Sequence, residues 1–138
     1  MFYSILSLLR IKDWVKNIIL FIPLIVSGHL SEANYYPNLV AAFILFCFSA
    51  SFIYIINDIT DINSDKKHPL KKNKKPLASG KLSLKFAYIT SLLLLILILI
   101  LLYFNFFLLY HLLGYIFLNL LYNFLLKKIA IIDLLVLS

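Results

Sequence analysis

Residues 86–126 have the sequence FAYITSLLLLILILILLYFNFFLLYHLLGYIFLNLLYNFLL, in which no Asp, Glu, Lys or Arg occurs. As helix, this stretch would be about 62 Å long at about 1.5 Å per residue, roughly twice the hydrocarbon thickness of a bilayer. Asn105 lies near its middle, where a turn is expected. The stretch therefore predicts two membrane-spanning helices, at 83–104 and 106–126.

The composition of the whole chain also indicates that most of it is surrounded by lipid. Of its 138 residues 63% are hydrophobic and 14% are charged, and the mean hydropathy is +0.98. A soluble domain is typically about half apolar and a quarter charged. A chain this short cannot hide so many apolar side chains in one core, and disorder requires low hydrophobicity. These numbers exclude a water-soluble enzyme and place most of the chain in lipid.

Further apolar segments extend the pattern. Charge-free runs between Lys16 and Glu32, and between Glu32 and Asp58, predict spans at 14–31 and 38–57, with Trp14 as an interfacial anchor. After Lys128 a new run, 129–138, is long enough for half a crossing. We therefore expect an all-α, multi-pass transmembrane bundle of four complete spans and the start of a fifth. Residues 1–138 would form one incomplete transmembrane domain, the N-terminal part of a longer protein or a truncated product.

The 13 Lys and Arg residues predict the topology. They lie before the first predicted span, in or beside the segment 58–82, or after the fourth span, and the two opposite loops hold none. The positive-inside rule then places the N-terminus, the Asp- and Lys-rich loop 58–82 and Lys127 in the cytoplasm, with the chain in the inner membrane. Because the cations cluster between apolar spans, they favour a membrane-lipid environment and argue against a nucleic-acid partner.

Carboxylates gather at the expected cytoplasmic end of the second span. On a helix that continues past residue 57, Asp58, Asp61 and Asp65 would lie within about 60° of one another, and Asn57 would widen that face to roughly 100°. Mg²⁺ would offset their repulsion, since it prefers carboxylate oxygens and often shares them with substrate phosphates. The alternative is a solvated helix end paired with lysines. A calcium loop is excluded, because Lys66 and Lys72 occupy its glycine and glutamate positions.

Six lysines follow the aspartates within ten residues, at positions 66, 67, 71, 72, 74 and 75. Ammonium groups beside a metal site are suited to a phosphate-rich ligand. Two simpler interpretations remain open: ordinary positive-inside charge, and contact with anionic lipid headgroups. The combination of aspartates and lysines is more specific than either group alone.

These motifs resemble those of a known family. The pattern NDxxDxxxD at 57–65 resembles the first aspartate motif of the UbiA superfamily of intramembrane prenyltransferases, and KPLASG at 75–80 resembles its RPLxSG element, with lysine in place of arginine. Tyr122 with Lys127 and Lys128 resembles a further Tyr/Lys element. The opening residues 10–17, with Pro23 and Gly28, and the pair His68-Pro69 are similar to polyprenyl-phosphate phosphoribosyltransferases of the decaprenyl-phosphate type.

The resemblance implies a reaction and its site. A magnesium-dependent membrane transferase would move 5-phosphoribose from phosphoribosyl pyrophosphate to a polyprenyl phosphate and release pyrophosphate. The residues expected to hold the metal are Asp58, Asp61, Asp65 and Asn57. The residues expected to contact substrate are Lys16, Lys71, Lys75, Tyr122, Lys127 and Asp133, the last because an intramembrane carboxylate is functional by default.

Two alternatives remain open. One is the wider family's chemistry, prenyl transfer from a prenyl diphosphate to an aromatic acceptor. The other is a non-catalytic membrane protein, either a small carrier or a truncated remnant. The family's second aspartate-rich motif has no counterpart, because Asp133 is the only acidic residue after Asp65. We therefore expect this piece alone to hold half a metal site and to be inactive. Cys47, His29 and His111 are interpreted as structural.

Overall fold

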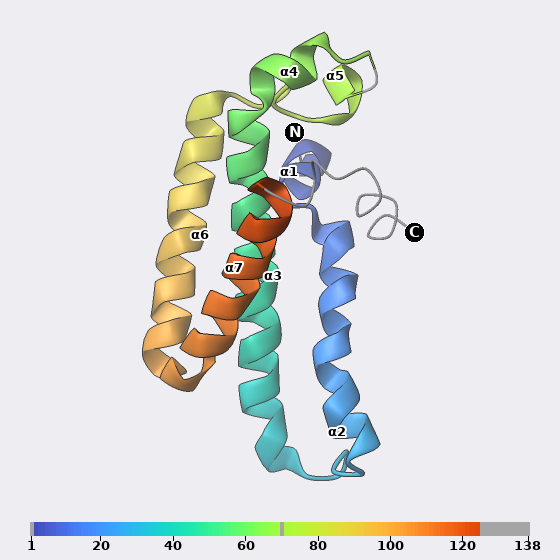
Figure 1. The fold of residues 1–138 in the computed structure, drawn as a ribbon, viewed down its shortest axis with the longest axis vertical. Helices are drawn as coiled ribbons and strands as arrows, with labels where there is room; N and C mark the ends of the chain where they lie inside the picture. Colours follow the sequence, from blue (N-terminus) through green and yellow to red (C-terminus); the bar gives the residue numbers. More distant parts are fainter. Residues whose placement is uncertain (1, 70, 125–138) are drawn as a thin grey trace. The chain divides into compact units, whose positions relative to one another are not determined.

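The computed structural model describes residues 2–69 and 71–124. The chain divides into two compact units, Met1–Asn105 and Phe106–Ser138. Every regular element in the described residues is helical, which confirms the all-α class (Figure 1). The first unit contains α1 (Phe2–Leu8), the 3₁₀ helix η1 (Ile11–Phe21), α2 (Ile22–Val26), η2 (Ala33–Tyr35), α3 (Tyr36–Thr60), α4 (Ile62–Lys67), α5 (Lys71–Lys74) and α6 (Leu84–Phe104). The second unit contains η3 (Phe106–Leu108) and α7 (Leu109–Phe124).

Two helices in the described residues have the length and apolar character needed to cross a membrane. They are Ala33–Thr60 and Leu84–Phe104. They correspond to the spans predicted at 38–57 and 83–104. The segment predicted as a span at 106–126 contains a shorter apolar helix, Phe106–Phe117. The count of four spans stays a prediction, and the partial span 129–138 lies outside the described residues.

The boundaries of α6 follow from its sequence. Ser83 precedes the helix, and its hydroxyl accepts a hydrogen bond of 3.2 Å from the backbone N–H of Phe86, an N-cap that satisfies an otherwise unpaired donor. The helix ends at Phe104, and the Asn105 side chain donates to the carbonyl oxygen of Leu101 at 3.1 Å. The helix therefore ends next to Asn105, where a turn is predicted.

The segment predicted as the first span, 14–31, is not one continuous helix. The helical segment begins earlier, at Ile11, and changes from 3₁₀ to α geometry at Ile22. Pro23 lies at the start of α2, where its missing N–H costs no hydrogen bond. After Val26 the chain turns at Gly28, whose φ of 77° suits a residue without a side chain.

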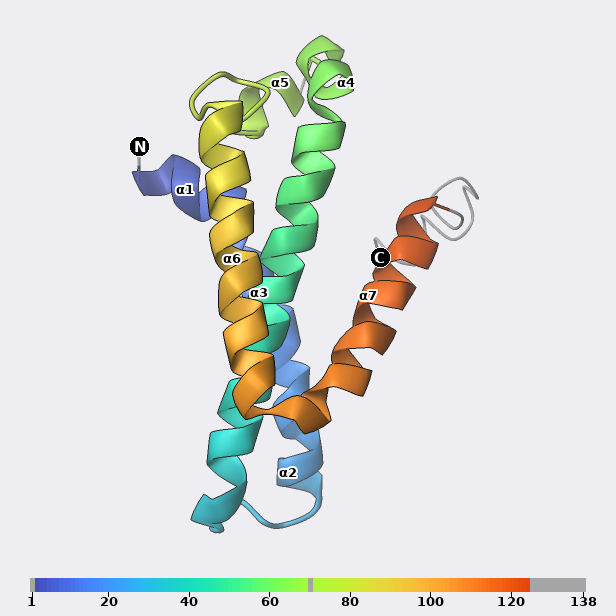
Figure 2. The same ribbon diagram turned by 90° about the vertical axis from the view of Figure 1, so that its left-hand side faces the viewer.

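The segments of the first unit pack around α3. On one side α3 lies beside α6, and on another beside η1, as Figures 1 and 2 both show. At one end of α3, a core of fully or nearly buried residues joins α1, α3, α6 and the segment between α5 and α6: Leu8, Ile55, Leu77, Leu82, Ala87 and Leu94. Many leucines elsewhere on α6 are exposed, as expected of a helix whose outer face meets lipid. The core therefore holds the segment 75–83 against the end of α3.

Candidate functional site

Asp58 is a buried carboxylate in the last turn of α3. Its side chain is 3% exposed, although most residues on the following segment are polar and accessible. A buried carboxylate is costly unless opposite charges and hydrogen bonds compensate for the lost water. The surroundings of Asp58 must therefore supply cations, and they come from two distant parts of the sequence.

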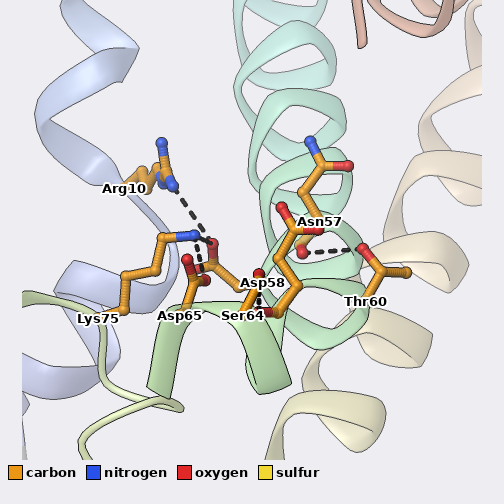
Figure 3. A network of polar contacts seen from close by, with 8 residues as sticks. Arg10, Asn57, Asp58, Thr60, Ser64, Asp65 and Lys75 are labelled. Carbon is orange, nitrogen blue, oxygen red and sulfur yellow. Dashed lines mark hydrogen bonds and ion pairs between the residues drawn. The ribbon is translucent and has the colours of Figure 1, made fainter. Parts of the chain in front are cut away.

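Lys75 is the first of these cations. It lies just after α5, and its Nζ is 2.9 Å from Asp58 Oδ1 and 2.6 Å from Asp65 Oδ2 (Figure 3). Asp65, on α4, is as buried as Asp58, and the Lys75 side chain is 20% exposed. Burial alone would lower the pKa of Lys75, but its bonds to Asp65 and Asp58 outweigh burial and raise that pKa. Lys75 is therefore a charged bridge between two buried carboxylates.

Arg10 is the second cation. Its Nη2 donates to Asp58 Oδ1 at 3.3 Å (Figure 3). Its guanidinium lies 4.3 Å from the ring centroid of Tyr54, one helical turn before Asp58. Arg10 has a φ of 49°, a left-handed conformation that costs free energy for a residue with a side chain. This conformation ends α1 and begins η1, so the chain changes direction where the guanidinium meets α3.

A pair of hydrogen bonds supports the turn at Arg10. The Ser51 hydroxyl on α3 donates to the carbonyl oxygen of Leu9 at 2.6 Å and accepts from Trp14 Nε1 at 3.0 Å. Ser51 is fully buried. One side chain thus binds both sides of the turn, the residue before Arg10 and the helix after it. We interpret Ser51 and Trp14 as the groups that position Arg10.

The predicted face of three carboxylates does not form a common site. Among the described residues, no three His, Cys, Asp or Glu side chains lie close enough to hold a metal. The helix expected to continue through residue 65 is interrupted at Asp61, with φ −89° and ψ 3°, and α4 begins anew at Ile62. Asp58 and Asp65 share Lys75, whereas the Asp61 carboxylate takes no part in the ion pairs of the described part. Interruption of the helix is the physical reason for this difference.

The remaining pair still suits a magnesium ion. Both carboxylates approach one point, the position of Lys75 Nζ, and Mg²⁺ is commonly bound by one or two carboxylates together with substrate phosphates. The donor set therefore fits the metal with Asp58 and Asp65 as its protein ligands. Asn57 directly precedes Asp58 in the sequence. Its backbone carbonyl oxygen accepts a hydrogen bond of 2.9 Å from Thr60 Oγ1 (Figure 3).

A cavity of about 610 Å³ opens beside the ion pairs. Its charged lining residues are four cations and two carboxylates: Arg10, Lys12, Lys74, Lys75, Asp13 and Asp58. Tyr3, Leu6 and Ile11 contribute an apolar part of the wall. The excess of cations favours an anionic ligand, and the apolar wall suits a ligand that also carries hydrocarbon.

Of the other predicted substrate residues, only Lys16 has a described side chain, and it is not part of this cluster. Lys16 is largely exposed and pairs with Asp13 at 3.2 Å, so only its partner lines the cavity. The Lys71 and Tyr122 side chains lie outside the described part of the structure, although both residues belong to helices. Lys127 and Asp133 lie outside the described residues. Their predicted roles stay predictions.

The sequence patterns assign no site role to Lys12 or Tyr54. They include Arg10 in the opening motif 10–17 and Lys74 among the six lysines suited to a phosphate-rich ligand. Nothing local indicates that Arg10 approaches an aspartate 48 residues away. Tyr54 offers a weak signal, since it lies one turn before Asp58 and shares its helix face. A search for aromatic residues next to the aspartate motif would have found Tyr54 but not its cation.

The described structure is all-helical, and two of its helices have the length of a membrane span. A cationic pocket lies at the end of one of them. These features fit a helical membrane protein. A family model described as the UbiA prenyltransferase family matches residues 19–138. The chain belongs to this family, which confirms the resemblance of its motifs. No solved structure matches the chain significantly.

Three curated relatives illustrate the similarity. Decaprenyl-phosphate phosphoribosyltransferase of Corynebacterium glutamicum is 36% identical over 87 residues, which cover 62% of this chain and 26% of the relative. The protein of the same name from Mycolicibacterium smegmatis is 32% identical over 140 residues, 98% of this chain and 44% of the relative. Nodulation protein NoeC of Azorhizobium caulinodans is 42% identical over 74 residues, 54% of this chain and 24% of the relative. The chain thus spans less than half of each relative.

Proposed function

We propose that the protein transfers 5-phosphoribose from phosphoribosyl pyrophosphate to a polyprenyl phosphate. A phosphate oxygen of the lipid would form a bond to C1 of the ribose while the bond from C1 to pyrophosphate breaks. The observation that carries the proposal is the convergence of Asp58 and Asp65 on Lys75 beside a cation-rich cavity. The names of two relatives support the choice of donor and acceptor.

Asp58 and Asp65 would hold the magnesium ion, which when bound supplies positive charge to the pyrophosphate group. For these carboxylates to turn toward a metal, Lys75 must release at least one of them, because its Nζ occupies the point they share. The released ammonium group would then be free to contact a substrate phosphate. Arg10, Lys12 and Lys74 would attract the anionic donor to the same cavity.

The acceptor would enter from the membrane. The apolar wall of the cavity, formed by Tyr3, Leu6 and Ile11, would contact the first carbons of the polyprenyl chain. The distribution of cations supports a cytoplasmic position for this end of α3, where a soluble, highly charged donor is available. The proposed reaction therefore requires cationic side chains for the soluble donor and an apolar wall for the lipid acceptor.

Prenyl transfer from a prenyl diphosphate to an aromatic acceptor is the second candidate, because the matching family model is described by prenyltransferase chemistry. It would use the same carboxylates and cations, since both donors carry a diphosphate. A non-catalytic membrane protein is the third. It would retain the ion pairs as a purely structural feature.

The deciding experiment gives the full-length protein, purified from membranes, each radiolabelled donor in turn. Transfer of label from phosphoribosyl pyrophosphate into extracted lipid is expected, and it should require Mg²⁺. Label transferred only from a prenyl diphosphate would favour the second candidate, and no transfer from either donor would favour the third.

A further inference from the structure

A second cavity, of about 560 Å³, lies beside the segment that connects α5 to α6. No residue lines both cavities, and the connecting segment separates them. Lys74, Lys75 and Pro76 line the first cavity, whereas the next four residues, 77–80, line the second. The second cavity is therefore distinct from the site assigned above.

The charge of the second cavity has one sign. Among the described residues, its charged lining residues are Lys66 and Lys72, and none of the carboxylates lines it. Asp65 precedes Lys66 in α4, but its carboxylate pairs with Lys75 and is not among the groups that line this cavity. Neither Lys66 nor Lys72 forms an ion pair within the described part of the chain. Unlike the cations of the first cavity, these ammonium groups have their charge available to a ligand.

The rest of the lining is apolar or small. Leu77 and Leu82 belong to the buried core, and Leu84 is the first residue of α6, one of the two membrane-length helices. Ser79 and Ser83 contribute hydroxyl groups to the lining. The space beside Gly80 is open, because no atom lies within 4 Å of the position that a Cβ would occupy there. Two cations thus lie beside an apolar wall at the end of a membrane helix. This arrangement complements a phosphate group that carries hydrocarbon chains.

We propose that the second cavity binds the phosphate headgroup of an anionic membrane lipid, with Lys66 and Lys72 against the phosphate. Leu84, which is 41% exposed, would contact the upper part of the acyl chains. Basic pockets near the ends of membrane helices are suited to such headgroups, and each lysine near an anionic membrane contributes roughly fivefold in affinity. This inference goes beyond the proposed function and does not depend on it.

The test measures retention of phosphatidylglycerol by the full-length protein, extracted in detergent and supplied with phosphatidylcholine and phosphatidylglycerol. Native mass spectrometry reports the bound lipid. The variant Lys66→Gln/Lys72→Gln should weaken retention of phosphatidylglycerol by roughly 25-fold. The matched control Lys81→Gln/Lys85→Gln removes the same charge from two exposed residues that line neither cavity and should change retention less than about threefold.

Two further arms make the result decisive. Lys66→Arg/Lys72→Arg should restore retention, which shows that charge and not folding was lost. Titration with inorganic pyrophosphate, without divalent metal, tests a soluble ligand in its place. Reduced pyrophosphate binding with unchanged lipid retention would overturn the lipid assignment, and equal behaviour of the two double glutamine variants would overturn the site. Asp58→Asn should leave lipid retention intact, so failure of the proposed transfer reaction can be distinguished.

Discussion

The two cavities share the segment 74–80 as a wall but differ in how their charges are used. In the first, Arg10 and Lys75 are paired with buried carboxylates, so a ligand or metal must exchange existing ion pairs. In the second, Lys66 and Lys72 have no carboxylate beside them in the lining. Asp65 and Lys66 are adjacent in α4, but Asp65 pairs with Lys75 of the first cavity and Lys66 lines the second. The same short polar segment therefore contributes to two different pockets. A ligand of the first must displace existing ion pairs, whereas an anion can bind in the second without displacing any.

The largest effect is expected from removing a carboxylate of the first cavity. Asp58→Asn should lower transfer by roughly 100- to 1000-fold, because it removes a charge that supports the metal and the developing pyrophosphate. Binding of Mn²⁺, measured by electron paramagnetic resonance as a stand-in for Mg²⁺, should weaken with it. Glu32→Gln is the control, since it removes an exposed carboxylate paired only with His29. Normal Mn²⁺ affinity in Asp58→Asn would contradict the assigned metal role.

Lys75→Met tests the exchange of ion pairs directly. Without metal it should lower the free energy of unfolding by about 2 kcal/mol, because Asp58 and Asp65 lose a buried partner. Added Mn²⁺ should restore part of that loss, so the metal-induced rise in melting temperature should exceed that of the wild type. Lys81→Met, at an exposed position, is the control. If Mn²⁺ stabilises both variants equally, Lys75 does not compete with the metal.

The pH dependence of this difference has a definite sign. The pKa of Lys75 is raised above its ordinary value of 10.5 by Asp65 and Asp58 despite burial. The contribution of its charge to stability is then complete below pH 10.5 and is lost as the pH rises through the folded-state pKa. The wild type and Lys75→Met should therefore differ by a constant amount through neutral pH, and the gap in their free energies of unfolding should narrow in the alkaline range.

Ser51→Ala sharpens the comparison by disturbing only the support of the first cavity. It leaves the Trp14 N–H and the Leu9 carbonyl without their partner, which should lower the free energy of unfolding by about 1.5 kcal/mol. Retention of lipid at the second cavity should not change. The control is Ser49→Ala, because Ser49 is equally buried but bonds only to Leu45 of its own helix. Equal melting temperatures for the two variants would exclude a positioning role for Ser51.

The smallest effect is expected at Tyr54. Tyr54→Leu removes the ring under the Arg10 guanidinium and should raise KM for the donor by roughly three- to fivefold with little change in kcat. Tyr54→Phe keeps the ring and should retain the wild-type KM. A change of equal size in both variants would indicate that the hydroxyl, and not the ring, is responsible.

Much of this organisation was predictable from residue patterns. The long charge-free runs predicted α3 and α6, and Asn105 marked the turn between 83–104 and 106–126. The aspartate and lysine motifs located Asp58, Asp65 and Lys75, three residues that the structure brings together. The metal role predicted for Asp61 stays a prediction. Helical periodicity assumes a continuous helix, whereas α3 ends at Thr60 and α4 begins at Ile62, so the sequence alone does not give the position of Asp61 relative to Asp58 and Asp65.

By itself, the sequence determined the membrane environment, the family and the segment that carries the charged chemistry. These properties depend on composition and local spacing. The thickness of a bilayer sets the length of a membrane helix, and metal cations prefer carboxylate ligands, so both can be inferred from the sequence directly. Only the tertiary structure decided which charges are paired: Arg10 with Asp58 from 48 residues away, and Lys75 across two carboxylates. It also decided that Lys66 and Lys72 line a separate cavity. Such pairing depends on the turns at Arg10 and Asp61 and on the packing of Leu77 and Leu82, which no local pattern encodes.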